Sequence, residues 1–134
     1  MPSIMETIDI RTKSSFEIVN ITGKVNEAIK KSGIKAGILL VFTPHTTCAL
    51  TVNEDEPRLI GDVKNKLSEL VPKGKGYSHD NIDNNAHSHI LASIIGCSVT
   101  LPITNGRTTL GTWQSILFIE LDGPRNRRVV LQIG

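Results

Sequence analysis

The stretch from residue 98 to residue 133, SVTLPITNGRTTLGTWQSILFIELDGPRNRRVVLQI, decides the fold class. Asn105-Gly106 and Asp122-Gly123-Pro124 are turn sequences that divide it. The pattern between the turns predicts four strands, which are Ser98–Ile103, Arg107–Trp113, Ser115–Leu121 and Arg127–Ile133. Strands joined by such short turns pair in antiparallel fashion. The last third of the chain therefore predicts a largely antiparallel sheet.

Upstream of this stretch, strands and helices occur without regular alternation. Period-two patterns predict strands at Ser3–Arg11 and Phe16–Ile21. The apolar run Ala36–Phe42 predicts a buried strand, and Thr47–Asn53 predicts another. A doubly wound parallel fold would need strands and helices in regular alternation. We therefore expect an α+β fold, with a largely antiparallel sheet or sandwich, in a single domain over residues 1–134.

Two longer helices and one short helix are predicted. The first has Thr22 as its N-cap, and Gly33 ends it. The second opens at Glu54–Pro57, where acidic residues and a proline suit the first turn, and Pro72 ends it. Its apolar stripe consists of Leu59, Ile60, Val63, Leu67 and Leu70. The third helix, Ile90–Ile95, is expected to be short and buried.

The composition is that of a soluble globular protein, with 39% hydrophobic and 21% charged residues and a net charge of +2. Aromatic residues make up only 4%, which argues against a nucleic-acid partner, because such proteins usually combine a basic stripe with aromatics. The longest apolar run, Ile38–Phe42, is too short to cross a membrane, and no secretory signal is visible. Cys48 and Cys97 are far apart, so we expect buried free thiols and a cytoplasmic protein.

The four histidines are the first candidate functional residues. His45 lies beside Pro44 where two predicted strands meet, and His79, His87 and His89 crowd into one short polar segment. Imidazole groups bind metal ions, transfer protons and hold phosphate esters. For His45 alone, a hydrogen bond within a turn is the simpler explanation, and the other three also fit a solvated loop with a polar helix cap. None of the strong metal-binding motifs, such as H-E-x-x-H, is present.

Spacing within this segment separates the candidates further. Asp80 follows His79 and can orient its imidazole, as carboxylates do around metal sites. His87 and His89 would lie on one side of an extended chain, but at a helix start they would diverge by about 200°. In that case only one of the two needs to belong to a site. Asn85 or Ser88 is then the candidate helix cap.

Arginine is the second candidate group, because no lysine follows Lys75. Guanidinium groups suit planar, bidentate contact with phosphate or carboxylate. Arg107 and Arg125 both follow turn sequences, where a ligand can reach them, although ordinary surface arginines or salt bridges are the simpler explanation for each. Arg127 and Arg128 are adjacent in a strand and face opposite sides, so at most one of them shares a site.

Glu54 is the third candidate. It ends the strand that starts near His45, and we expect it to reach the same end of the sheet and to act as a general base. Its neighbours Asp55 and Glu56 are explained by the start of a helix. Trp113 can stack on a ligand ring, but a core or subunit-interface position is the simpler explanation.

Together these motifs resemble the YjbQ family. The resemblance rests on TPHTT at 43–47, VNE at 52–54, HD at 79–80, NNAHSH at 84–89, GR at 106–107, LGTWQ at 110–114 and ELDGPR at 120–125. It covers about residues 16–132, and the pairing of LGTWQ with the upstream A-H-x-H is specific. The resemblance implies a compact α+β domain with a β-sandwich-like core, and a homotrimer with sites near the subunit interfaces.

Carried over residue by residue, the resemblance places His45, His79 and His89 on the family's histidines. Glu54, Arg107 and Arg125 fall on its acid and arginines, while His87 is less constant in the pattern. The resemblance also implies an accessory activity as a secondary thiamine-phosphate synthase. Such an enzyme joins a pyrimidine diphosphate to a thiazole phosphate and releases pyrophosphate.

We therefore expect an enzyme that acts on a phosphorylated small molecule with the help of a divalent metal, zinc or magnesium. His45, His79 and His89 are the predicted metal ligands. The predicted catalytic residues are Glu54, Asp80 and His45, and the predicted substrate-binding residues are Arg107, Arg125, Asn53 and Thr47. A histidine-rich site suits zinc better than magnesium, which leaves metal-assisted phosphate-ester hydrolysis as an alternative reaction. A non-enzymatic trimer that binds a metal or an anion is the other alternative.

Overall fold

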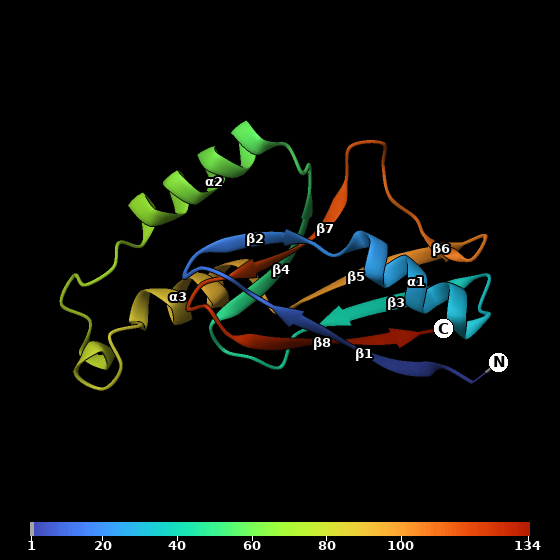
Figure 1. The fold of residues 1–134 in the computed structure, drawn as a ribbon, viewed down its shortest axis with the longest axis horizontal. Coiled ribbons are helices and arrows are strands. Elements are labelled where there is room, and N and C mark those ends of the chain that lie inside the picture. The colour runs from blue at the N-terminus through green and yellow to red at the C-terminus, as the bar shows by residue number, and fades with distance from the viewer. Residues whose placement is uncertain (1) are drawn as a thin grey trace.

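The computed structural model describes residues 2–134, which form two sheets (Figure 1). The larger sheet has the order β1-β8-β3-β5-β6, with β1 (Ile4–Arg11), β3 (Gly37–Phe42), β5 (Ser98–Thr104), β6 (Arg107–Thr108) and β8 (Asn126–Ile133). The smaller has the order β2-β7-β4, with β2 (Glu17–Asn20), β4 (Cys48–Asn53) and β7 (Ser115–Glu120). All strand pairs found within residues 2–134 are antiparallel, and the predicted α+β class is confirmed.

The main hydrophobic core lies between the two sheets. Leu39 of β3 and Leu131 of β8 face it from the larger sheet, and Leu50 of β4 and Phe118 of β7 face it from the smaller one; each is at most 1% exposed. Alternate residues of the smaller sheet point the other way, into a second cluster that includes Ile119. The smaller sheet is therefore covered on both faces.

The helices are α1 (Thr22–Ser32), α2 (Pro57–Leu70) and α3 (Ala86–Ile95), with a short 3₁₀ helix, η1 (Ser78–Asn81), before α3. Gly33 ends α1 in the left-handed conformation with φ of 74°, as predicted. Thr22 is the first helical residue and not the N-cap, because its hydroxyl accepts the backbone N–H of Ile116 at 2.8 Å. In residues 2–134, the helices lack the length and apolar character that crossing a membrane requires.

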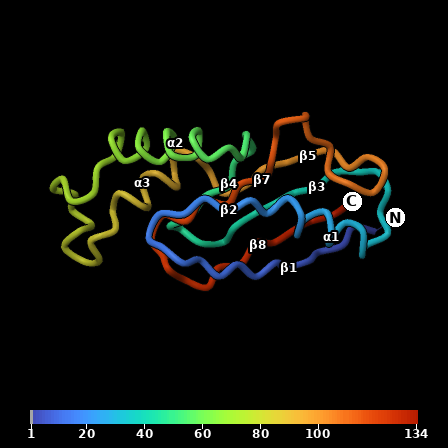
Figure 2. The backbone as a smooth tube through the Cα atoms, turned by 45° about the horizontal axis from the view of Figure 1, so that its top comes forward, coloured from blue at the N-terminus to red at the C-terminus, as the bar shows by residue number. Residues whose placement is uncertain are grey.

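Helices α2 and α3 both lie over the outer face of the smaller sheet, and α2 stands off from the body of the molecule (Figures 1 and 2). α3 starts four residues earlier than predicted, so His87 and His89 both fall in its first turns. Its prediction as a buried helix is only half correct, because Ile94 is 58% exposed while Leu91 is buried. One face of α3 packs on the small sheet, and the other faces solvent.

The apolar strand β3 is buried on one face only, which corrects the prediction of a wholly buried strand. Leu39 and Val41 are fully buried, whereas Ile38 is 61% exposed and Leu40 and Phe42 are more than a third exposed. Because successive side chains of β3 point to opposite faces, Ile38, Leu40 and Phe42 form an exposed apolar row on its outer face.

Two further predictions need correction. The predicted strand Arg107–Trp113 ends at Thr108, because Gly111 and Gln114 form a local turn. The Gly111 N–H donates to the Gln114 side chain and the Gln114 N–H donates to the Gly111 carbonyl, and these bonds replace strand pairing. Trp113 is 72% exposed, which rules out a core position within this chain. Both cysteines are free thiols as predicted, but only Cys48 is buried.

Candidate functional site

A polar cleft of about 390 Å³ lies where the loop after β3, the start of α3 and the turn between β7 and β8 meet. Four of the predicted site residues line it: His45, Thr47, His89 and Arg125. The fold brings them together because Thr47 precedes β4, while the β7 strand that pairs with β4 ends at the turn carrying Arg125. The backbone N–H of Leu121 donates to Thr47 at 3.1 Å and fixes the two segments side by side.

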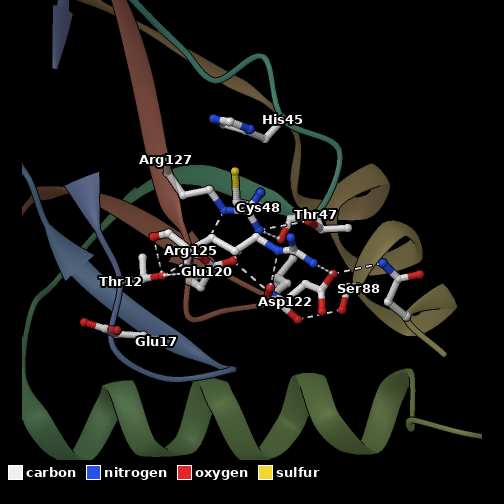
Figure 3. A network of polar contacts seen from close by, with 12 residues as sticks. Thr12, Glu17, His45, Thr47, Cys48, Ser88, Glu120, Asp122, Arg125 and Arg127 are labelled. Carbon is white, nitrogen blue, oxygen red and sulfur yellow. Dashed lines mark hydrogen bonds and ion pairs between the residues drawn. The ribbon is translucent and has the colours of Figure 1, made fainter. Parts of the chain in front are cut away.

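A buried ion pair forms the floor of this cleft (Figure 3). Glu120 is fully buried at the end of β7, and Arg127 of β8 is 5% exposed. Arg127 donates to both carboxylate oxygens of Glu120, at 2.9 and 2.5 Å, and its Nη2 also donates to the Thr47 hydroxyl at 2.8 Å. The Thr12 hydroxyl donates to Glu120 at 2.7 Å. This network joins β4, β7, β8 and the end of β1.

Glu120 and Arg127 are both ionised, and each charge stabilises the charged form of the other group. Burial raises the pKa of Glu120, but hydrogen bonds from Arg127 and Thr12 outweigh burial and hold it below the usual value. Burial likewise lowers the pKa of Arg127, and the Glu120 carboxylate more than reverses that effect. No hydrogen bond within residues 2–134 uses Nη1 of Arg127, a residue that lines the cleft. Its N–H groups are free to bind a ligand.

Arg125 adds a second guanidinium, which is mostly exposed. Its Nε donates to the backbone carbonyl of Asp122 at 2.7 Å, and its Nη2 donates to the Asp122 carboxylate at 3.1 Å. The same carboxylate accepts the side-chain amide of Asn85 at 2.9 Å. Asp122 thus fixes Arg125 in position beside the start of α3, with part of the guanidinium still available.

His45 is neutral at pH 7 in this arrangement. Burial lowers its pKa, and the nearby charges of Arg127 and Arg128 lower it further. Its Nε2 accepts the backbone N–H of Arg128 at 3.0 Å, so the ring proton resides on Nδ1. His45 therefore offers the cleft a neutral N–H donor.

The other histidines diverge as predicted for a helix start. His89 lines the cleft, and with His45 it also lines an adjoining hollow of about 470 Å³. His87 points into a different pocket, beside Lys73. The ring of His79 meets His89 edge-on at a centroid distance of 4.8 Å, and its Nε2 is buried without a hydrogen-bond partner.

The predicted three-histidine metal site does not form within one chain. In residues 2–134, no three His, Cys, Asp or Glu side chains are grouped closely enough to hold an ion. One ring nitrogen of His45 accepts a hydrogen bond and the other carries the proton, so neither has a free lone pair. The donor set therefore does not fit a metal in this arrangement, and a divalent ion remains a prediction.

Asp80 has a different position from the predicted one beside the His79 ring. Its carboxylate accepts the backbone N–H of Ala86 at 3.0 Å. Asn85, one of the two candidate caps, is at the N-cap position but makes no side-chain capping bond, and Ser88, the other, lies inside the helix. Asp80 therefore satisfies the exposed start of α3, the helix that carries His89.

Three predicted residues lie away from the cleft, in two different places. Asn53 ends β4 and Glu54 follows it, whereas β4 starts next to Thr47 and is roughly 20 Å long at about 3.3 Å per residue. The expectation that Glu54 reaches the end of the sheet that carries His45 is therefore wrong for a single chain. Arg107 lies beyond β5, beside Lys35 in a separate basic pocket. These residues can meet the cleft only from another copy of the chain.

The sequence patterns predict no role for Glu120 and leave open which of Arg127 and Arg128 shares the site. A signal was present, because Glu120 interrupts the apolar run from Ile116 to Leu121. A charge inside such a run requires a buried partner. Cys48 also lies near His45 (Figure 3), but burial raises the pKa of its thiol, which makes it a poor nucleophile.

The sandwich of antiparallel sheets, with a cleft lined by arginine and histidine side chains, defines a compact α+β protein. A family model described as UPF0047 protein YjbQ-like matches residues 6–134, and the chain belongs to this family. The resemblance seen in the motifs is thereby confirmed.

Curated relatives agree with this assignment over nearly the full length. A UPF0047 protein of Methanothermobacter thermautotrophicus is 46% identical over 129 residues, covering 96% of this chain and 90% of the relative. UPF0047 protein YugU of Bacillus subtilis is 33% identical over 134 residues, covering 97% and 98%. These names give a family and no activity.

Solved structures share the fold. A YbjQ-like protein of unknown function from Sulfolobus solfataricus has a TM-score of 0.95 and 38% identity, covering 98% of this chain and 96% of that one. A hypothetical protein from Aeropyrum pernix has a TM-score of 0.94 and 42% identity, covering 98% of each chain. The sheets and helices described above are therefore those of the family.

Proposed function

We propose that this protein is an enzyme that binds a phosphorylated small molecule in the cleft between His45, His89 and Arg125. The observation that carries the proposal is the convergence of hydrogen-bond donors on that cleft. These donors are the guanidinium N–H groups of Arg125 that do not bind Asp122, the Nη1 group of Arg127 and the Nδ1–H of His45. Guanidinium groups and neutral imidazole donors together suit the several oxygens of a phosphate or diphosphate.

In this proposal each residue has a distinct task. Arg125 and Arg127 neutralise negative charge that develops on a departing phosphate or diphosphate. His45 donates to one of its oxygens and orients it. His89 lines the same cleft, its ring makes no hydrogen bond within residues 2–134, and it is our candidate for proton transfer.

The reaction class that follows from the family resemblance is transfer from a diphosphate ester, as in thiamine-phosphate synthesis. Such a step breaks a carbon–oxygen bond to diphosphate, and the arginines would hold the leaving group. Hydrolysis of a phosphate ester uses the same binding groups and is the alternative reaction. A divalent ion would supply further charge neutralisation if it bound, and it would require His45 to give up its bond to Arg128.

The test compares Arg125→Ala and His89→Ala with Arg11→Ala, which lies outside the cleft. Pyrophosphate release from a pyrimidine diphosphate plus a thiazole phosphate, and hydrolysis of p-nitrophenyl phosphate, are both measured, with metal content determined on the same samples. We expect one reaction to be detectable and to fall at least tenfold in the two cleft variants only. Turnover that the cleft variants leave unchanged would overturn the proposal. Pyrophosphate binding without turnover would favour the non-enzymatic alternative.

We also propose that the chain assembles as a homotrimer through the bare face of the larger sheet. The support is an exposed apolar row along β3, formed by Ile38, Leu40 and Phe42, with Met5 exposed on the same face two strands away on β1. Apolar patches of this kind on soluble proteins mark protein contacts. Assembly would also let Asn53, Glu54 or Arg107 of one copy approach the cleft of another.

A further inference from the structure

Helix α2 covers the smaller sheet without packing tightly on it. None of its residues is fully buried, although Leu59, Ile60, Val63 and Leu67 form the apolar stripe that the sequence predicts. Between this stripe and the strands β2, β4 and β7 lies a cavity of about 170 Å³. The stripe is therefore half-covered and faces a hollow instead of filling it.

The lining of this cavity is almost entirely aliphatic. The sheet contributes Leu117 and Ile119, and α3 contributes Ile95. Polar side chains appear only where β4 ends, from Thr51, Asn53 and Glu54. A small apolar pocket with a few polar groups at one side is the usual form of a ligand site.

The Glu54 carboxylate lacks a counter-charge. It is partly buried, yet it makes no hydrogen bond or ion pair with any residue from 2 to 134, whereas the nearby Glu56 caps α2 and pairs with Arg58. A carboxylate beside an apolar surface is stabilised by a positive partner that shares its desolvated position. The cavity therefore has a negative mouth and an apolar interior.

The size of the cavity limits the ligand to about one ring. An apolar protein cavity of about 150 Å³ stays dry and takes up benzene. We propose that the cavity beneath α2 binds a small molecule that combines one apolar ring with a protonated amine. The ring lies among Leu67, Ile95 and Leu117, and the ammonium group contacts Glu54. Within one chain this cavity shares no lining residue with the arginine-lined cleft, and the proposal does not depend on the function of that cleft.

The experiment titrates benzylammonium into the full chain and follows the methyl NMR signals of isoleucine, leucine and valine. Benzoate is the matched probe, with a similar ring and the opposite charge. We expect benzylammonium to shift the signals of Leu67, Ile95 and Leu117 and to bind at least tenfold more tightly than benzoate. The absence of shifts at millimolar benzylammonium, or equal affinity for both probes, would overturn the proposal.

Variants separate the charge from the cavity. Glu54→Gln should remove the preference for benzylammonium, while Asp62→Asn, an equal loss of charge on an exposed position of α2, should leave it unchanged. Val63→Phe should fill the cavity and prevent both probes from binding; Leu67→Phe is the second filling variant, and the methyl spectrum shows that each is folded. Binding that survives both filling variants, or a preference that survives Glu54→Gln, would also overturn the proposal.

Discussion

At the scale of single residues, the Glu120–Arg127 pair has the largest expected effect on stability. Both side chains are almost completely buried, and each leaves the other without a counter-charge if it is removed. Breaking a buried pair on one side costs far more than the net stabilisation that the intact pair provides. The pair is therefore a strict requirement for the floor of the cleft.

We predict that Glu120→Gln lowers the free energy of unfolding by about 3–5 kcal/mol, because the Arg127 charge stays buried without its carboxylate. Urea denaturation measures the change. Glu69→Gln is the control, since its pair with Lys66 is 69–79% exposed and should change stability by less than about 1 kcal/mol. Equal effects of the two substitutions would contradict the prediction.

The lowered pKa of His45 predicts how the stability of the protein changes with pH. Its folded-state pKa lies below that of the unfolded chain, whose histidines titrate near pH 6.5, so the unfolded chain takes up the proton first as the pH falls. The contribution of His45 is complete above about pH 6.5 and is lost as the pH falls through its lowered pKa. In His45→Gln, which keeps an acceptor for Arg128, we expect thermal stability to fall less than in the wild type as the pH is lowered below about 6.5.

His87 provides a comparison, because burial, and then the charge of Lys73, lowers its pKa as well. His87→Gln should remove a separate part of the same pH dependence. Glu120 acts in a different window, since its lowered pKa contributes stability that is lost only under more acidic conditions. An identical pH profile in the wild type and His45→Gln would show that the histidine is not buried as described.

At this scale the sequence predicted which residue types matter better than it predicted their partners. His45, His89, Thr47 and Arg125 were all expected at a site, and the structure brings them to one cleft. The position of Glu54 was predicted wrongly because it follows the end of β4, whereas Thr47 precedes the start. The two ends of a strand lie at opposite ends of the sheet. The pairing of Glu120 with Arg127 depends on how β7 and β8 meet, which no local pattern contains.

At the scale of elements, α3 places the histidines of the 79–89 segment. The helix begins at Ala86, so His87 and His89 diverge, and only His89 reaches the cleft. Its start is held by a side chain six residues upstream, since Asp80 accepts the Ala86 N–H. That link joins η1 to α3.

We predict that Asp80→Ala destabilises the protein by about 1 kcal/mol, the usual cost of losing a helix cap. Asp80→Asn keeps an acceptor and should cost only a fraction of that. Amide hydrogen exchange at the start of α3 should quicken in the alanine variant. If Asp80 is a proton-transfer residue instead, Asp80→Asn would abolish turnover without loosening α3.

Element boundaries were predictable where local chemistry decides them. Gly33 ends α1, and Asn105 and Gly106, both with positive φ, make the tight β5–β6 turn, as their sequences indicate. The strand expected over Arg107–Trp113 failed because the bond from Gly111 N–H to the Gln114 side chain competes with strand pairing. Such local turns are not visible in hydrophobic periodicity.

At the scale of the whole molecule, the two sheets differ in what covers them. The smaller sheet has the main core on one face and α3 on the other, whereas the outer face of the larger sheet exposes Ile38, Leu40, Phe42 and Met5. The continuous apolar run of β3 predicts a strand that is buried on both faces. That pattern is explained if its outer face is buried against another chain, because a continuous apolar run then has two covered faces.

The proposed homotrimer gives the last prediction. Leu40→Lys places a charge in the centre of the bare face, where burying it without a partner is costly. We expect native mass measurements to give a trimer for the wild type and a monomer for Leu40→Lys. Leu70→Lys, an equivalent change at an exposed leucine of α2, should remain a trimer. A monomeric wild type would contradict the assembly, and a trimeric Leu40→Lys would place the subunit contact on another surface.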